Sequence, residues 1–149
     1  MINKEDGDNY IVYFRIAKNL YKNCIEKDLK KYNLAHNEIE IINYLSRNSE
    51  QNTARDIAEY LGLSKGMISR TIDQLLTKEI LEFEKDKKDK RILRLKITEK
   101  SKNLMNDLEK SREKFLVELT KDIEDDKLDV FTDILEAMIS NLKELEKNI

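Results

Sequence analysis

The chain has 149 residues, of which 40% are hydrophobic and 39% are charged, and it contains three glycines, no proline and no tryptophan. The hydrophobic share excludes a wholly disordered chain, and the length suits one domain, expected here to cover residues 1–149. Because so much charge leaves each long helix with only one apolar stripe, we expect a core that is shared between two chains.

The N-terminal part is expected to form a frayed tail at residues 1–9, followed by a long amphipathic helix. Apolar residues recur at spacings of three and four over residues 10–32, which predicts one helix with one buried stripe. Cys24, the single cysteine, lies inside this stripe, so we interpret it as a buried structural thiol. The sequence has neither a signal-peptide pattern nor an apolar run of ~20 residues, so we expect a cytoplasmic protein with no membrane partner.

Two short helices joined by a turn that contains glycine are predicted in the middle of the chain. After a helix at residues 37–47, Thr53 and Asp56 fit the capping-box pattern that begins a helix, and Gly62 ends that helix. Ser64 is placed to cap the next helix, expected over about residues 64–78. Two helices at this spacing form a helix-turn-helix, whose second helix enters the major groove of DNA.

The N-terminal half of that second helix carries side chains suited to a DNA duplex. Arg70 can pair with guanine, Gln74 can pair with adenine, and Met67 can touch a thymine methyl group. Gly66 allows a close approach, while lysine and serine suit phosphates. The predicted DNA contacts are Ser64, Lys65, Gly66, Met67, Ser69, Arg70 and Gln74. The alternative is that these residues are only the solvated face of a small helix.

A period of two follows, which predicts a β-hairpin wing over about residues 80–97 with a charged tip. Residues 53–98 carry eleven basic and eight acidic side chains in a chain of net charge −2, and such a local excess acts within ~10 Å. The predicted contacts to phosphates or the minor groove are Lys85, Lys87, Lys88, Lys90 and Arg91. Asp86 and Asp89 do not suit a DNA-facing tip, and Asp89 is interpreted as a partner of Arg91 or of a basic residue on the recognition helix that holds the wing's shape. Taken alone, a lysine-rich turn is more typical of a solvated loop, and its place directly after a helix-turn-helix favours a wing.

The C-terminal region, residues 99–149, is expected to form two helices. Thr98 is placed to cap the first, and the acidic cluster at residues 122–126 suits the N-terminal end of the second. Apolar residues of the last helix recur at alternating spacings of three and four, namely at Leu128, Phe131, Leu135, Met138, Leu142, Leu145 and Ile149. Such a seam is typical of a helix that packs against another helix along its whole length.

The expected fold is mainly α with a small β-hairpin wing, and its winged helix-turn-helix lobe covers residues 37–98. From about Tyr10 to Leu145 the chain resembles the multiple-antibiotic-resistance regulator (MarR) family. The resemblance rests on Ala58, Gly62 and Ile68 in TARDIAEYLGLSKGMISRTIDQLL, on the wing DKKDKR, and on ITEKS at residues 97–101, which is similar to the family's LTxxG. It implies a homodimer held by helices within residues 10–32 and 99–149, a palindromic operator in double-stranded DNA, and often repression that a small ligand or oxidant relieves.

The chain departs from the family pattern at several positions. Phe83 and Glu84 stand where family wings usually have arginines, and Lys90 stands where an arginine often follows Asp89. Glu79 replaces the glycine that ends the recognition helix, and Ser101 replaces the LTxxG glycine. Together these departures favour weaker or differently aimed phosphate contacts.

The resemblance also implies an effector pocket between the dimer helices and the winged-helix lobe. A small aromatic or phenolic effector is the expected occupant, and the candidate lining residues are Tyr13, Ile16, Tyr32 and Tyr44. Aromatic residues at helical spacing are also typical of plain core. His36, expected at the surface near the start of the second helix, is the single histidine, so we expect no metal site and no cofactor. Without a nucleophile motif or a glycine-rich phosphate loop, we expect no enzyme.

Two hypotheses of function follow. The first is a homodimeric, sequence-specific regulator of transcription, most readily a repressor, whose two recognition helices read a pseudo-palindrome ~34 Å apart. The second is a winged-helix protein-interaction module, dimerised by its C-terminal heptad helix, without specific DNA binding. The acidic Glu79, Glu82 and Glu84, close to the expected DNA face, motivate the second.

Overall fold

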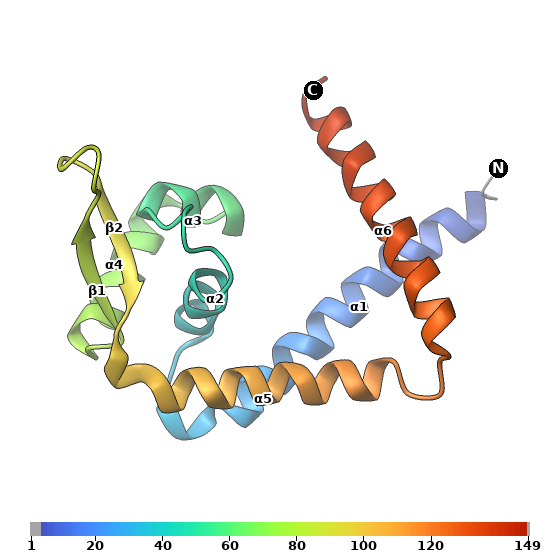
Figure 1. Ribbon diagram of the computed structural model, residues 1–149, viewed down its shortest axis with the longest axis horizontal. Helices are drawn as coiled ribbons and strands as arrows, with labels where there is room; N and C mark the ends of the chain where they lie inside the picture. The colour runs from blue at the N-terminus through green and yellow to red at the C-terminus, as the bar shows by residue number, and fades with distance from the viewer. Residues whose placement is uncertain (1–3, 149) are drawn as a thin grey trace. The chain divides into compact units, whose positions relative to one another are not determined.

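The computed structural model describes residues 4–148, which form helices and one two-stranded antiparallel sheet (Figure 1). The chain divides into two compact units, residues 1–112 and 113–149. The elements are α1 (Lys4–Asp28), the 3-10 turn η1 (Lys30–Tyr32), α2 (His36–Leu45), α3 (Ala54–Leu61), α4 (Lys65–Thr77), β1 (Leu81–Lys85), β2 (Leu93–Ile97), the 3-10 turn η2 (Glu99–Ser101), α5 (Lys102–Leu119) and α6 (Asp125–Glu146). The mainly α fold with one hairpin is therefore confirmed.

The N-terminal helix differs from its predicted bounds at both ends. It already includes residues 4–9, where a frayed tail was expected, while residues 1–3 lie outside the described part. It ends at Asp28 rather than near Tyr32, because the chain tightens into η1 and Asn33 then adopts a left-handed conformation with φ 50°. A left-handed residue stops a right-handed helix, so the long apolar stripe spans two elements.

Local capping signals fix the helix-turn-helix. The Thr53 side chain accepts a hydrogen bond from the Asp56 N–H, and the Asp56 carboxylate accepts from the Thr53 N–H at 2.9 Å, so the predicted capping box is present. Gly62 ends α3 with φ 64°, a conformation that glycine adopts without a Cβ penalty. The Ser64 hydroxyl then accepts from the Met67 N–H at 3.3 Å and begins α4.

The recognition helix ends in a Schellman motif that has glutamate where glycine is the usual residue. The Glu79 N–H donates to the Leu76 carbonyl at 2.9 Å and the Ile80 N–H to the Leu75 carbonyl at 3.0 Å, while Glu79 has φ 56°. A left-handed conformation costs a residue with a Cβ about 1–2 kcal/mol. The Glu79 carboxylate pairs with Lys100 at 2.8 Å, but this pair is exposed and offsets little of that cost.

The hydrophobic core lies in the first unit and gathers around α2. The apolar side chains with at most 1% exposure are Ile25, Leu29, Ile41, Ile42, Ile57, Ile68, Leu75, Leu95 and Leu108. They come from α1, the residue that follows it, α2, α3, α4, β2 and α5, so each of these elements buries one face against the same cluster. The recognition helix is thereby held by its inner face, and its outer face stays open to solvent.

Two buried polar groups tie helices to α2. Glu38, 1% exposed, accepts from the Ala35 N–H and from Lys78 Nζ, each at 2.7 Å, which anchors the end of α4. Arg112, 5% exposed, donates to Asn43 Oδ1 at 3.1 Å and to the Ser46 hydroxyl, which anchors α5. Both links join residues far apart in the sequence.

The hairpin is buried at its base and exposed toward its tip. Leu81 and Leu95 are buried, whereas Phe83 is 49% and Leu93 48% exposed, although the register places Leu95 opposite Phe83. After β2, Thr98 was expected to cap a helix with its side chain, but it does not. Its hydroxyl donates to a backbone carbonyl at 2.7 Å instead, and the chain forms η2 before α5 begins.

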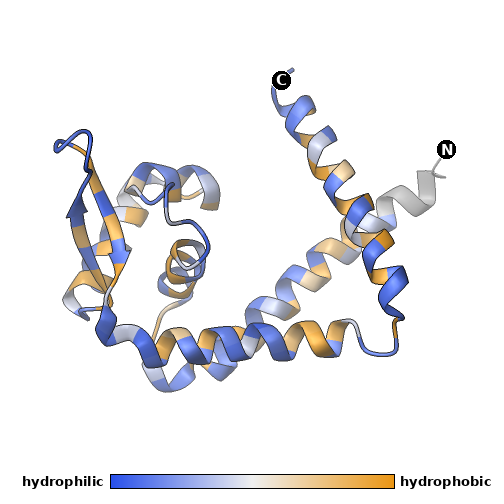
Figure 2. Cartoon of the chain, viewed as in Figure 1, coloured by the Kyte–Doolittle hydropathy of each residue, from blue (hydrophilic) through white to orange (hydrophobic). Residues whose placement is uncertain are grey.

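Large apolar side chains outside the core remain exposed on α1 and α6. Figure 2 shows apolar residues in orange along both helices. On α1 they are Tyr10, Ile11, Val12, Tyr13, Phe14, Ile16 and Leu20, and on the seam of α6 they are Phe131, Met138, Leu142 and Leu145. The last seam position, Ile149, lies outside the described residues. Within residues 4–148, no helix is both long and apolar enough to cross a membrane.

The prediction of a buried thiol at Cys24 is wrong, because Cys24 is exposed in this chain. Near its C-terminal end, α1 meets the core through Ile25. Consecutive helical residues point ~100° apart, so a residue beside a buried one can face solvent.

Candidate nucleic-acid interface

The outer face of α4 presents every residue that was predicted to contact DNA from this helix. All seven are exposed, and the helix buries Ile68, Thr71, Ile72 and Leu75 on its other side. Arg70 and Gln74 lie one turn apart, so they are neighbours on that open face. Asp73 is also exposed and adds one acidic group to the helix.

Two of these residues have local features that bear on their roles. The Ser64 hydroxyl already caps the helix, so its first task in the free protein is structural. Gly66 has no left-handed conformation, and a Cβ added there meets nothing within 4 Å. The fold of the chain therefore gives no reason for glycine at this position, whereas a close approach by a duplex does.

The five cations predicted on the wing are all exposed. Among the described residues, Lys87, Lys88 and Lys90 make no ion pair. Arg91 is bound to Asp89, with 3.1 Å between Arg91 Nε and Asp89 Oδ1, and this contact lowers the pKa of the Asp89 carboxyl group. Asp89 thus contacts one of the two partners expected for it. Lys85 likewise makes no ion pair within the described residues, so four exposed lysines of the wing are unpaired.

Asp86, which did not suit a DNA-facing tip, organises the tip from inside. Its Oδ1 accepts the N–H groups of Lys88 and Asp89, each at 2.8 Å, and its Oδ2 accepts from Arg94 Nε at 2.5 Å. The N–H of Asp89, the Arg94 guanidinium and the N–H of Lys88 lower the pKa of Asp86 to about 2. Aspartate that accepts backbone N–H groups two and three residues ahead is a known turn signal, so this role was readable from the sequence.

Arg94 was not predicted as a site residue, and its guanidinium is engaged within the protein. Besides Asp86, its Nη1 donates to the Glu50 carbonyl at 2.5 Å and to Asn52 Oδ1 at 2.9 Å. Because these partners lie more than 40 residues earlier in the chain, no local pattern could have indicated them.

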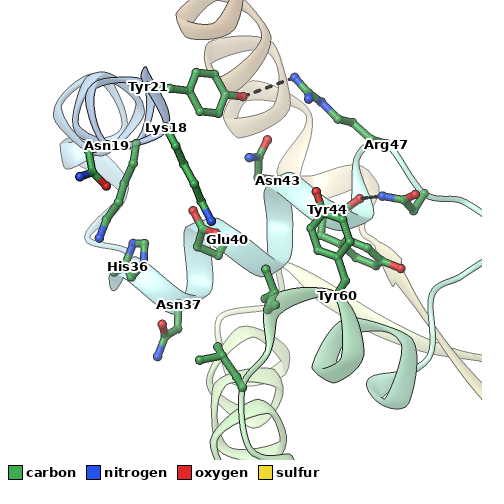
Figure 3. Close-up of a pocket in the computed structure, with 14 residues that line it drawn as sticks. Lys18, Asn19, Tyr21, His36, Asn37, Glu40, Asn43, Tyr44, Arg47 and Tyr60 are labelled. Carbon is green, nitrogen blue, oxygen red and sulfur yellow. Dashed lines mark hydrogen bonds between the residues drawn. The ribbon is translucent and has the colours of Figure 1, made fainter. Parts of the chain in front are cut away.

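A cavity with a volume of about 740 Å³ lies between α1, α2 and α3 (Figure 3). Its lining includes four side chains that are or can become cationic, three tyrosines and a single carboxylate, namely Lys18, Lys22, His36, Arg47, Tyr21, Tyr44, Tyr60 and Glu40. The ring centroids of Tyr44 and Tyr60 lie 4.6 Å apart, which gives the cavity one aromatic wall. The arrangement suits a small aromatic anion.

Only Tyr44, among the four residues predicted to line an effector pocket, lines this cavity. Tyr13 and Ile16 are exposed on α1, at least two residues before the cavity-lining part of that helix begins. Tyr32 faces α5, where its hydroxyl donates to Asp107 at 2.6 Å. His36 is exposed at the start of α2, as expected, and its Nδ1 lies 2.7 Å from Glu26.

Residues 34–101 match the family of winged helix DNA-binding domains. This span contains α2, both helices of the helix-turn-helix and the wing. The comparison with curated protein sequences gave no match.

Solved structures share the fold over almost the whole chain. A MarR transcriptional regulator from Methanosarcina mazei Go1 is similar at 25% identity with a TM-score of 0.74, covering 95% of this chain and 99% of that one. A MarR family protein from Bacillus stearothermophilus is 13% identical with a TM-score of 0.77, covering 96% and 99%. The S. aureus MepR–DNA complex is 18% identical with a TM-score of 0.70, covering 89% and 96%.

Proposed function

We propose that this chain, whose residues 34–101 match the winged helix DNA-binding domains and whose fold is similar to that of MarR regulators, is a homodimeric, sequence-specific DNA-binding regulator of the MarR family, acting as a repressor. One observation carries the proposal: the open face of α4 and the unpaired wing lysines are both exposed within a matched winged helix DNA-binding domain. The similarity of MepR, which was solved with DNA, supports it. The activity is binding rather than catalysis, and it belongs in the cytoplasm with the chromosome.

In this proposal, the recognition helix reads the major groove and the wing grips the backbone. Arg70 and Gln74 have the functional groups that pair with guanine and adenine edges, and Met67 is 44% exposed for a thymine methyl group. The wing lysines neutralise phosphates or enter the adjacent minor groove. A dimer presents two such modules ~34 Å apart, which matches successive major grooves of a pseudo-palindrome.

Selection from a random double-stranded DNA library tests the proposal without knowledge of the operator. Purified protein should enrich an inverted repeat, and a labelled duplex of that sequence should bind with an affinity that falls steeply as salt rises. A duplex with one half-site scrambled is the control and should bind more weakly. A protein that enriches no sequence and shifts no duplex even at low salt is not a DNA-binding regulator.

The cavity supports release of DNA by a small aromatic acid. Lys18, Lys22 and Arg47 supply positive charge, and Tyr44 and Tyr60 supply the aromatic wall, so a benzoate-like anion fits its chemistry. Benzoate should raise the melting temperature and weaken DNA binding, whereas benzamide, of the same shape but neutral, should do neither. Equal effects of benzoate and benzamide would contradict the inference that the positive side chains of the cavity select an anion.

The winged-helix protein-interaction module remains the second candidate, because β1 has an unusual exposed face. Glu82 and Glu84 are exposed, and the intervening Phe83 is 49% exposed on the opposite side of the strand. Acidic groups repel phosphates and an exposed aromatic favours a protein partner. The absence of any enriched DNA in the selection experiment favours this module over the regulator.

A further inference from the structure

The outer half of the wing lacks support from the core. The sheet has only two strands, and a two-stranded sheet is marginally stable by itself. Leu93, beside the tip, and Phe83, in the middle of β1, are each about half exposed, and the nearest buried side chain of β2 is Leu95. Something other than apolar burial must therefore fix the direction in which the tip lysines point.

Arg94 supplies that support, because it connects the tip of the wing to the segment before α3. Its side chain is 30% exposed, and that of its partner Asp86 is 14% exposed. One edge of the guanidinium holds Asp86, which in turn holds the tip N–H groups of Lys88 and Asp89. The other edge donates to the Glu50 carbonyl and to Asn52.

Backbone contacts extend the same connection to the helix-turn-helix. The Leu95 N–H donates to the Asn52 carbonyl at 2.8 Å, and Asn52 Nδ2 donates back to the Leu95 carbonyl at 3.1 Å. The next residue, Thr53, is the N-cap of α3. Residues 50–52 therefore contact the second strand of the wing and lead directly into the first helix of the helix-turn-helix.

We propose that Arg94 is a positioning residue for DNA binding, which sets the wing against residues 50–52 so that its lysines reach the phosphates while α4 occupies the major groove. The inference rests on the proposed DNA-binding function. Arg94 itself is not a phosphate contact in this scheme, because its Nε and Nη1 donate within the protein and its charge is balanced by Asp86.

Replacing Asp86 by asparagine separates positioning from simple electrostatics. The substitution removes a negative charge near the duplex, so coulombic attraction alone predicts tighter binding. The contacts of Arg94 with Asp86, Glu50 and Asn52 form what we call the clamp, and its loss predicts the opposite result. Binding should be about tenfold weaker, and the slope of log affinity against log salt concentration, the salt slope, should be smaller in magnitude by about 1 to 2, because wing lysines lose their phosphates. Both quantities are measured by fluorescence anisotropy on the selected duplex over a series of salt concentrations.

Glu82→Gln is the matched control, since Glu82 is an exposed acid on the wing outside the clamp. It should bind as tightly as the wild type or slightly more tightly, with an unchanged salt slope. Asp86→Asn that binds as tightly as Glu82→Gln overturns the proposal. A wild-type protein that fails to bind the duplex instead overturns the proposed function, so the two failures are distinct.

Arg94→Lys provides a second variant if Asp86→Asn does not fold. Lysine keeps the charge but lacks the planar fork that reaches two partners at once. The clamp predicts weaker binding and a smaller salt slope for Arg94→Lys, whereas Lys96→Gln, which removes a charge from the next outward-facing position of β2, should leave the slope nearly unchanged. An Arg94→Lys protein with the wild-type slope rejects the proposal.

Discussion

Gly66 is the residue whose identity the fold of the free chain explains least. It lies in the first turn of α4, with ordinary helical geometry and open space where a side-chain methyl group would lie. Alanine at this position should therefore leave the free energy of unfolding unchanged or raise it by no more than about 1 kcal/mol. If the helix N-terminus approaches a duplex closely, however, the added methyl group should clash with the DNA.

The expected result for Gly66→Ala is a melting temperature at or above the wild-type value together with weaker binding to the selected duplex. Calorimetry and anisotropy measure the two quantities separately. Thr77→Ala, at the exposed C-terminal end of the same helix and outside the predicted DNA contacts, is the control and should leave the affinity unchanged. Unchanged affinity of Gly66→Ala would mean that the duplex does not approach α4 at this point.

Asp86 gives the wing a defined pH dependence. Its folded-state pKa of about 2 lies below its ordinary value of 3.8, because the tip N–H groups and Arg94 stabilise the carboxylate. A group with a depressed pKa contributes stability that is fully present above the ordinary value and is lost as pH falls from about 4 through about 2. The wing should therefore keep its geometry well below neutral pH.

The chemical shift of the Asp86 carboxyl carbon, followed by NMR as the pH is lowered, measures this pKa. The midpoint should lie near pH 2 in the wild type. In Arg94→Lys it should rise yet stay below 3.8, because the N–H groups of Lys88 and Asp89 still donate. A wild-type midpoint close to 3.8 would contradict the clamp geometry.

At the scale of elements, α4 and the wing should make different contacts with DNA: α4 with the bases and the wing with the phosphates. Arg70→Ala removes a group that can pair with guanine, so it should cost about 1–3 kcal/mol on the selected duplex and relax the preference at one base pair. Lys88→Gln removes a phosphate contact, so it should weaken binding to all sequences alike and reduce the salt slope by about 1. Selection repeated with each variant, and anisotropy on matched and scrambled duplexes, measure both effects.

A uniform loss of affinity for Arg70→Ala would show that Arg70 contacts the backbone instead. Lys143→Gln, which removes an exposed charge from α6, is the control for net charge and should have little effect on either quantity.

The anchoring of α5 to α2 by Arg112 makes a prediction about stability. Arg112→Met keeps an unbranched apolar stem like that of arginine but leaves the Asn43 and Ser46 oxygens without their buried donor. Urea denaturation should show a free energy of unfolding lower by about 2–3 kcal/mol. The exposed Lys110→Met, on the same helix, should change it by less than about 0.5 kcal/mol. Equal stabilities of the two variants would contradict the buried network.

The elements were largely predictable because their signals are local. Thr53, Asp56, Gly62 and Ser64 lie within twelve residues and fix where two helices begin and end. The alternation in the hairpin likewise predicts both strands, whose register follows from their short connection. The recognition helix and its open face were therefore accessible from the sequence.

What sequence reasoning missed depends on contacts between distant residues. Arg94 meets Asn52 across 42 positions, and Arg112 meets Asn43 across 69. Only folding brings such partners together, so a periodic pattern cannot indicate them. The lining of the cavity between α1, α2 and α3 was not predictable for the same reason: periodicity marks which face of α1 is apolar, but not which part of it faces α2 and α3. The prediction for Cys24 was wrong because a residue that lies within an apolar stripe of the sequence can still be exposed in the single chain.

At the scale of the whole molecule, the apolar side chains that the single chain leaves exposed point to a second copy. None of the described residues of α6 is buried, yet this helix carries a regular apolar seam. Exposed apolar surface of this extent is unusual for a monomer and typical of an interface. The proposed regulator needs that interface, because one winged-helix lobe reads only half of a palindrome.

Charged residues in the seam of α6 should therefore separate the copies and abolish tight DNA binding together. Phe131 and Leu142 are 51% and 62% exposed, so replacing both by glutamate leaves the core of the first unit intact. Light scattering should give twice the 17.7 kDa chain mass for the wild type and a single chain mass for the double variant, whose binding to the selected duplex should weaken at least tenfold. Ser140→Glu adds a charge on the opposite side of the same helix and should stay dimeric. A wild type that is monomeric at micromolar concentration would remove the basis for reading an inverted repeat. A double variant that remains a dimer would place the interface elsewhere.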